Sequence, residues 1–188
     1  MNEIDEAVTH LKDVLKRHNI DPRQGLPESV FLLTTALVPT VNIDLFIVDE
    51  LGRLLLTWRE NYYNTCGWHI PGGCVRLQEE FSTRVQKTAI AEIGSKVEYR
   101  KSPIAIRGAI SNKGDRDLYN QLERSHGISF LYFARLPQGI TISNESESEN
   151  TPGYRKWFQK MPEKILPIHM QLYGDILKDW FDEKRFSV

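Results

Sequence analysis

The sequence predicts an α/β protein of the α+β kind, in which a mixed β-sheet is sandwiched between helices and one extra helix precedes the main domain. Its 188 residues, 40% apolar and 26% charged, suit one globular domain. Runs rich in β-branched and aromatic residues alternate with helical patterns, which is typical of sheets covered by helices. A Pro/Gly-rich segment follows the first helical pattern, so we expect an N-terminal helix and linker over 1–27 and the main domain over 28–188.

The N-terminal helix is predicted over 2–18, with Asn2 as its cap and a stop at 19–22. Its apolar residues recur at helical spacing: Ile4, Ala7, Val8, Leu11, Val14 and Leu15. This pattern fits a helix that covers part of the core, and it fits equally a helix that packs on a second subunit as a homodimer element.

The main domain begins with two strand patterns, 41–48 and 54–58, separated by turn residues at 49–52. Together they predict a β-hairpin. A helix is predicted over 82–92, with Gly94 as its left-handed cap. Later elements follow from the same patterns: strands over 96–100, 104–110 and 128–136, and a helix over 165–181.

Two polar segments, 111–127 and 143–153, are predicted to be long loops, which in a compact domain are usually functional or disordered. The second is acidic. Basic residues lie on or beside the first, and one or two of them are expected to meet phosphate: Arg107, Lys113, Arg116 and Arg124.

The charge balance excludes some classes of function. With 24 Lys and Arg against 25 Asp and Glu, the chain has no global field to hold a nucleic acid polymer. The longest uncharged stretch, 29–43, is shorter than a membrane span and contains Pro39. The acidic N-terminus does not resemble a secretory signal, and the two cysteines, Cys66 and Cys74, are expected to be free thiols. We therefore expect a cytoplasmic protein that does not bind membranes.

The most informative stretch is the Pro71-Gly72-Gly73 turn and the helix after it. Such a turn lets a ligand approach the backbone closely, and its carbonyls can point at a cation. Glu79 follows Gly73 by six residues, and Glu92 follows Glu79 by thirteen. Each element is common alone, but the ordered spacing is not.

With Gly73, Glu79, Glu92 and Gly94 in this order, and Lys87 in place of an arginine, the segment resembles the signature of the Nudix hydrolases. The resemblance covers about 42–167. It implies the Nudix fold, a divalent cation and hydrolysis of a small nucleoside diphosphate derivative.

Three glutamates on one helix face bind the cations in that family, and the matching positions here are Thr88, Ala91 and Glu92. One carboxylate therefore remains. Mg²⁺ accepts waters and substrate phosphates as further ligands, so we expect one ion rather than two or three, with Mn²⁺ as an alternative.

The Lys87, Ala91, Glu92 and Gly94 pattern is similar to the branch of GDP-mannose mannosyl hydrolases. That resemblance implies a metal held by Glu92 and the carbonyl of Gly72, and attack of water on the sugar carbon.

It also implies that Asp44 contacts the base and that Arg59 stabilises the departing diphosphate. The arginine that follows the glycine pair in that branch is Cys74 here, and Arg76 is the candidate substitute.

The loop histidine that serves this branch as general base has no counterpart before Tyr154. Glu149 or Glu147 is the candidate base or metal ligand, and a merely solvated loop is the alternative. His126 is a candidate substrate contact, whereas His69 is expected either to contact substrate or to face solvent as an ordinary strand residue.

Two further expectations concern the segment that resembles the Nudix signature and the strand before it. Glu79 is expected to support the site as a partner of Lys87, and Trp68 is expected in the core.

The predicted function is hydrolysis of a nucleoside diphosphate linked to a sugar or similar moiety. Two alternatives remain: a pyrophosphatase that cleaves the P–O–P bond, and a non-catalytic module that binds nucleotide sugars.

Overall fold

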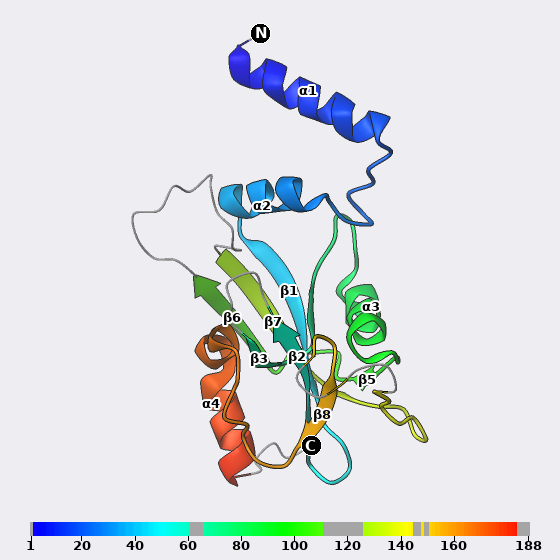
Figure 1. Cartoon of the computed structure of the whole chain (residues 1–188), viewed down its shortest axis with the longest axis vertical. Helices are drawn as coiled ribbons and strands as arrows, with labels where there is room; N and C mark the ends of the chain where they lie inside the picture. Colours follow the sequence, from blue (N-terminus) through cyan, green and yellow to red (C-terminus); the bar gives the residue numbers. More distant parts are fainter. Residues whose placement is uncertain (1, 61–65, 111–125, 145–147, 149–150, 184–188) are drawn as a thin grey trace.

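A computed structural model describes residues 2–60, 66–110, 126–144, 148 and 151–183. The helices are α1 (Glu3–Arg17), α2 (Glu28–Leu37), α3 (Phe81–Ile93) and α4 (Pro167–Glu183) (Figure 1). The strands are β1 (Thr40–Ile47), β2 (Leu54–Glu60), β3 (Cys66–His69), β4 (Gly72–Cys74), β5 (Glu98–Tyr99), β6 (Ala105–Ile110), β7 (His126–Arg135) and β8 (Arg155–Phe158).

The strands form two sheets. In the first, β1 pairs in parallel with β7 and antiparallel with β4, while β5 and β6 both pair antiparallel with β7. The second sheet is antiparallel and has the order β3-β2-β8. The predicted mixed sheet is therefore confirmed, with a smaller sheet beside it.

Helices α3 and α4 lie on opposite sides of the sheets (Figure 1). Alternate residues of β1 and β7 supply the two cores, because successive strand residues point to opposite faces. Ile43, Leu45 and Ile47 pack toward α3, and Phe46 packs with Trp180 of α4. The predicted sandwich of sheet between helices is confirmed.

The predicted β-hairpin over 41–58 is wrong. Its two strands belong to different sheets and meet only through a single bridge between Val48 and Leu54. Both are buried on both faces, so each needs neighbours of its own on either side. The turn between them is a corner between the two sheets. It is held by the Asp49 carboxylate, which accepts the Arg53 backbone N–H at 2.8 Å.

Helix α2 and strand β8 were not predicted. Helix α2 has no side-chain cap and follows Pro27. Its apolar residues also suit a strand, which explains why its periodicity gave no clear signal.

The predicted N-terminal helix is present and has a capping box between Asn2 and Asp5. Helix α1 extends from the body (Figure 1), and none of its described residues is buried. No helix in the described ranges is long and apolar enough to span a membrane.

Candidate active site

Glu92 is the residue around which the candidate site is built. It lies in the last turn of α3, which ends at Gly94 with a left-handed φ of 76°. One carboxylate oxygen, Oε1, accepts a hydrogen bond from Arg59 Nη2 at 3.0 Å. The other, Oε2, lies 3.4 Å from both His69 Nε2 and the Thr57 hydroxyl.

The pairing of β2 with β3 brings these partners to one place. Thr57 lies opposite His69 in the antiparallel ladder, and Arg59 lies opposite Gly67. Thr57 and Arg59 are two residues apart on β2, so their side chains leave the same face. The carbonyl of Glu92 also accepts a hydrogen bond from Arg155 Nε at 2.8 Å, which links the helix end to β8.

The Glu92 carboxyl is held in its anionic form. Burial alone would raise its pKa, but His69, Arg59 and Thr57 together outweigh that effect and lower it. Its side chain is 19% exposed, so the carboxylate remains open to solvent on one side. A partly buried, ionised carboxylate beside an arginine suits a cation or the charge of a diphosphate.

His69 does not face solvent: its side chain is only 3% exposed. The expectation that it is a solvent-facing strand residue is wrong, because β3 lies in a sheet whose face is covered by the end of α3. Nδ1 lies 2.8 Å from the carbonyl of Thr57, which can only accept, so Nδ1 carries a proton. Burial lowers the pKa of His69, against the opposing effect of the Glu92 carboxylate.

Asp44 lies directly beneath the Gly-Gly turn. It pairs with Gly72 in the ladder between β1 and β4, and a Cβ added at Gly72 would overlap Asp44 Oδ1. Its carboxyl accepts a hydrogen bond from the Tyr173 hydroxyl of α4 at 2.6 Å. Burial raises the pKa of Asp44 to about 6, although the hydrogen bonds from Tyr173 and Ser129 oppose the rise.

Gly73 is constrained in the same way. A Cβ there would lie 2.6 Å from the Thr88 hydroxyl, which is buried and has no hydrogen-bond partner among the described residues. Thr88 occupies the first of the three positions expected for glutamates, so its side chain packs under the turn and offers no charge to a cation.

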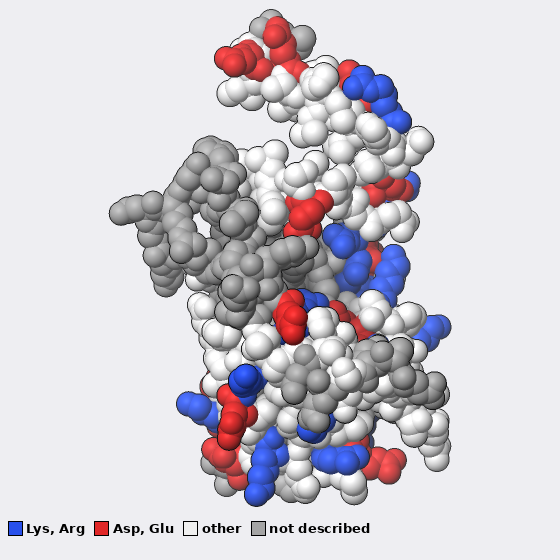
Figure 2. Space-filling model, viewed as in Figure 1, with Lys and Arg blue, Asp and Glu red and all other residues white. Residues whose placement is uncertain are grey.

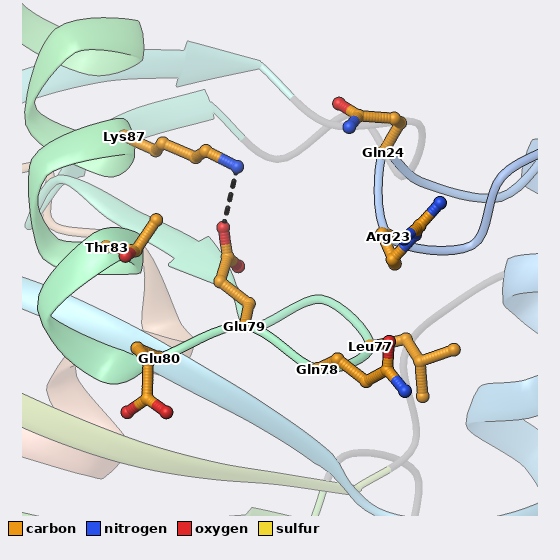
Figure 3. A pocket seen from close by; sticks show the side chains of 8 residues that line it. All are labelled: Arg23, Gln24, Leu77, Gln78, Glu79, Glu80, Thr83 and Lys87. Atoms are coloured by element: carbon orange, nitrogen blue, oxygen red, sulfur yellow. Dashed lines mark ion pairs between the residues drawn. The ribbon is translucent and has the colours of Figure 1, made fainter.

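Glu79 joins the loop before α3 to the helix. Its carboxylate accepts the Arg76 backbone N–H at 3.0 Å and Arg84 Nε at 2.7 Å. Lys87 Nζ lies 3.0 Å from the same carboxylate (Figure 3). The Glu79 side chain is 5% exposed. Its lone pairs therefore face protein cations, and Arg84 is a partner that the sequence analysis missed.

An open pocket of about 210 Å³ lies between the linker that joins α1 to α2 and this loop (Figure 3). It is lined by Arg23, Gln24, Leu77, Gln78, Glu79, Glu80, Thr83 and Lys87. Figure 2 shows Lys and Arg side chains gathered beside the start of α3, below the linker from α1.

Two predicted site residues lie away from Glu92, namely Arg76 and His126. The Arg76 guanidinium is beside Gly25 of the linker, where a Cβ would meet its carbon at 3.6 Å. His126 begins β7, five strand positions before Leu131, the partner of Asp44, which is about 16 Å along the strand. Glu149 lies outside the described residues, as does Glu147.

The sequence analysis missed several polar residues of this region. Thr57 stands within an apolar run and looks like an ordinary strand residue. Tyr173, Ser129 and His169 reach the site from α4 and β7, so only the fold reveals their proximity. His169 accepts the Ile70 backbone N–H through Nδ1 at 3.3 Å, and burial places its pKa well below the usual value.

The donor set fits one divalent cation. In the described part of the chain no three His, Cys, Asp or Glu side chains gather as a metal-binding group. Glu92 nevertheless supplies an ionised oxygen near Asp44, whose ladder partner is Gly72. A single carboxylate, backbone carbonyls and substrate oxygens are ligands of the kind that Mg²⁺ uses.

Comparisons of the sequence with known proteins give a partial match. No family model matches the chain. A stretch of 73 residues, 39% of the chain, is 34% identical to the low-salt glycan biosynthesis protein Agl8 of Haloferax volcanii and spans only 46% of that protein.

Solved structures show the fold. A Nudix hydrolase from Nitrosomonas europaea superposes with a TM-score of 0.52 and 14% identity, over 74% of this chain and 88% of the other. The MutT protein of Methanosarcina mazei gives a TM-score of 0.52 and 16% identity, over 78% and 95%. An ADP-ribose pyrophosphatase from Streptococcus suis gives 0.50 and 18%, over 80% and 96%.

Proposed function

Because the chain has the fold of the Nudix hydrolases, we propose that it is a divalent-metal-dependent hydrolase of nucleoside diphosphates linked to a sugar or similar moiety. One observation carries the proposal: an ionised Glu92, paired with Arg59, lies near enough to Asp44, the ladder partner of Gly72, to act on its charge.

Each residue of the site has an expected role in this proposal. Glu92 and the carbonyl of Gly72 would hold Mg²⁺, or Mn²⁺ in its place, and the bound ion would neutralise the charge of the diphosphate. The Arg59 guanidinium, 44% exposed, is free to turn from Glu92 toward a substrate phosphate. Glu79, Arg84 and Lys87 fix the loop that precedes α3.

The substrate class has two supports. The partial match to Agl8, a protein named for glycan biosynthesis, favours an activated sugar. The sequence pattern at Lys87, Ala91 and Glu92 favours the GDP-mannose type, with attack of water at the sugar carbon.

We place Asp44 differently from the role that the branch resemblance implies for it. Its carboxyl is 6% exposed and engaged by Tyr173, so its role in this proposal is to hold the Gly72 turn rather than to read a base. Glu149 remains the proposed base or metal ligand.

The first test is a screen of nucleoside diphosphate sugars with Mg²⁺, with separate detection of free sugar and of phosphate products. Replacement Glu92→Gln should reduce metal-dependent turnover at least 100-fold, because it removes the charge that faces the ion. The matched control is Glu98→Gln, an exposed strand residue away from the site, which should keep full activity. Equal turnover of Glu92→Gln and wild type would refute the site.

Reaction in ¹⁸O-water then separates the two modes of cleavage. Label in the sugar indicates attack on carbon, and label in a phosphate product indicates cleavage of the P–O–P bond.

A binding module without catalysis is the second candidate, and the uncharged Thr88 and Ala91 positions favour it. Calorimetric titration with the same sugars distinguishes it from an enzyme. Tight binding without turnover across the panel would support the module.

A further inference from the structure

Helix α1 presents an apolar face of which no residue is buried against the described part of the chain. The residues of this face recur at a spacing of three and four positions: Ile4, Ala7, Val8, Leu11, Val14 and Leu15. Ile4 is 73% exposed and Val8 is 44% exposed, and α1 extends from the body (Figure 1). A contiguous apolar face of this kind marks a surface on which another molecule packs.

The helix needs such a partner for its own stability. A helix of 15 residues is marginal in water even when it is rich in alanine, and most helices in proteins are stabilised by packing of an amphipathic face. The capping box of Asn2 and Asp5 stabilises the first turn, but it acts at the end of the helix and not along its length. Burial of the apolar face supplies the stabilisation that the cap does not.

The charges of α1 complement themselves in one orientation. The first turn carries Glu3, Asp5 and Glu6, and the last turn carries Lys16 and Arg17. When two copies of α1 lie antiparallel, the acidic turn of each helix meets the basic turn of the other, and the two helix dipoles are opposed. Parallel pairing would place like charges together. The charge pattern therefore favours a second copy of this chain, in the antiparallel orientation.

The apolar residues fit the same orientation. Written as a heptad, α1 has Ile4 and Leu11 at a positions, and Ala7 and Val14 at d positions. In an antiparallel pair that crosses near the middle of the helix, Ile4 lies opposite the partner's Val14. The small Ala7 then lies opposite the partner's Leu11, so a small side chain meets a large one. These residues form one continuous apolar seam between the two helices.

We propose that two copies of the chain form a dimer through an antiparallel pair of α1 helices. In an interface with two-fold symmetry the same face serves both copies, so it must match itself in charge and in apolar pattern, as α1 does. A standard interface buries about 800 Å² on each partner, which is more than one face of a 15-residue helix offers. Leu33 and Leu37 of α2, exposed at the same end of the molecule (Figure 1), supply further apolar area. The proposal does not depend on the proposed function.

The oligomeric state of the full chain tests this proposal. Sedimentation equilibrium between about 1 and about 200 µM should show a monomer and a dimer in exchange. Leu11→Lys should weaken the dimer at least 10-fold, because it places a charge in the apolar seam. Thr9→Lys is the matched control: Thr9 is exposed on the opposite face of α1, so the dissociation constant should stay within about twofold of the wild type.

An exchange of charges tests the orientation. Glu3→Lys and Arg17→Glu should each weaken the dimer at least threefold, because each places like charges across the antiparallel pair. The variant that carries both replacements should dimerise more tightly than either single variant. Glu3 and Arg17 lie about 21 Å apart along one helix, so this recovery can come only from a second copy.

Three results would overturn the proposal. The first is a chain that remains monomeric at about 200 µM, including one whose α1 instead binds vesicles of phosphatidylserine and phosphatidylcholine. The second is a dimer that Leu11→Lys leaves unchanged, because its interface would lie elsewhere. The third is a double charge variant that dimerises more weakly than both single variants, which would exclude antiparallel pairing.

Discussion

Replacement of Asp44 by Asn should change how the stability of the protein depends on pH. Asp44 is 6% exposed, accepts the Tyr173 hydroxyl, and has a pKa raised by burial to about 6, against 3.8 for an ordinary aspartate. Asn keeps an acceptor for Tyr173 and never ionises. The variant therefore removes only the cost of placing a charge in this position.

The sign and size of this pH dependence follow from the pKa values of Asp44 in the unfolded chain and in the folded protein. Below the pKa of Asp44 in the unfolded chain, the carboxyl is protonated in both the folded and the unfolded protein, so its ionisation costs no stability. As the pH rises, the unfolded chain loses its proton first, and stability falls until the folded carboxyl also ionises near pH 6. A difference of about two pKa units corresponds to a total loss of about 3 kcal/mol in the free energy of unfolding, of which about 2 kcal/mol is lost between pH 4.5 and 7.

Urea unfolding of both proteins at pH 4.5, 5.5, 6.5 and 7.5, with EDTA present, measures this difference. The free energy of unfolding of the wild type, minus that of Asp44→Asn, should fall by about 2 kcal/mol across the series and level off above pH 7. A difference that is constant with pH, or that rises, would refute the buried, protonatable state of Asp44.

Three further predictions concern packing. Gly94→Ala should destabilise the protein by about 1 kcal/mol in thermal unfolding, because Gly94 has a left-handed φ of 76°. Gly108→Ala is the control: its Cβ would meet no atom within 4 Å and its φ is not positive, so stability should change by less than about 0.5 kcal/mol. Equal effects would contradict the cap. Thr88→Val should stabilise by about 1 kcal/mol in urea unfolding, since it removes a buried hydroxyl without a partner; a loss would show that the hydroxyl is bonded. Glu79→Gln should cost about 2 kcal/mol in the same assay because Arg84 and Lys87 lose their shared anion, and an unchanged stability would contradict that pairing.

The elements that local chemistry controls could be predicted from the sequence. The capping box at Asn2 and the Gly94 cap are local features, and α1 and α3 begin and end within a residue or two of the prediction. The same is true of the final helix, α4. Periodicity and caps act within a few residues and do not depend on the rest of the fold.

Contacts between distant segments could not be predicted in this way. The turn at 49–52 has the residues of a hairpin, but whether its strands pair depends on the partners that β4, β7 and β8 offer. His69 shows the same limit, since its position in the sequence suits either face of a strand. Only the pairing of β2 with β3 and the approach of α3 bring it to Glu92.

The candidate site also shows which parts of the motif are explained by packing alone. Gly72 and Gly73 are required for space, because Asp44 and Thr88 lie where their Cβ atoms would be, so the glycine pair would be needed even in a protein that binds no cation. The pair of Glu92 and Arg59 has no such explanation. With the arginine 44% exposed, the ion pair contributes at most about 1 kcal/mol, whereas partial burial of the carboxylate opposes its ionisation. Stability therefore does not account for Glu92 in this position, whereas the proposed binding of a cation would.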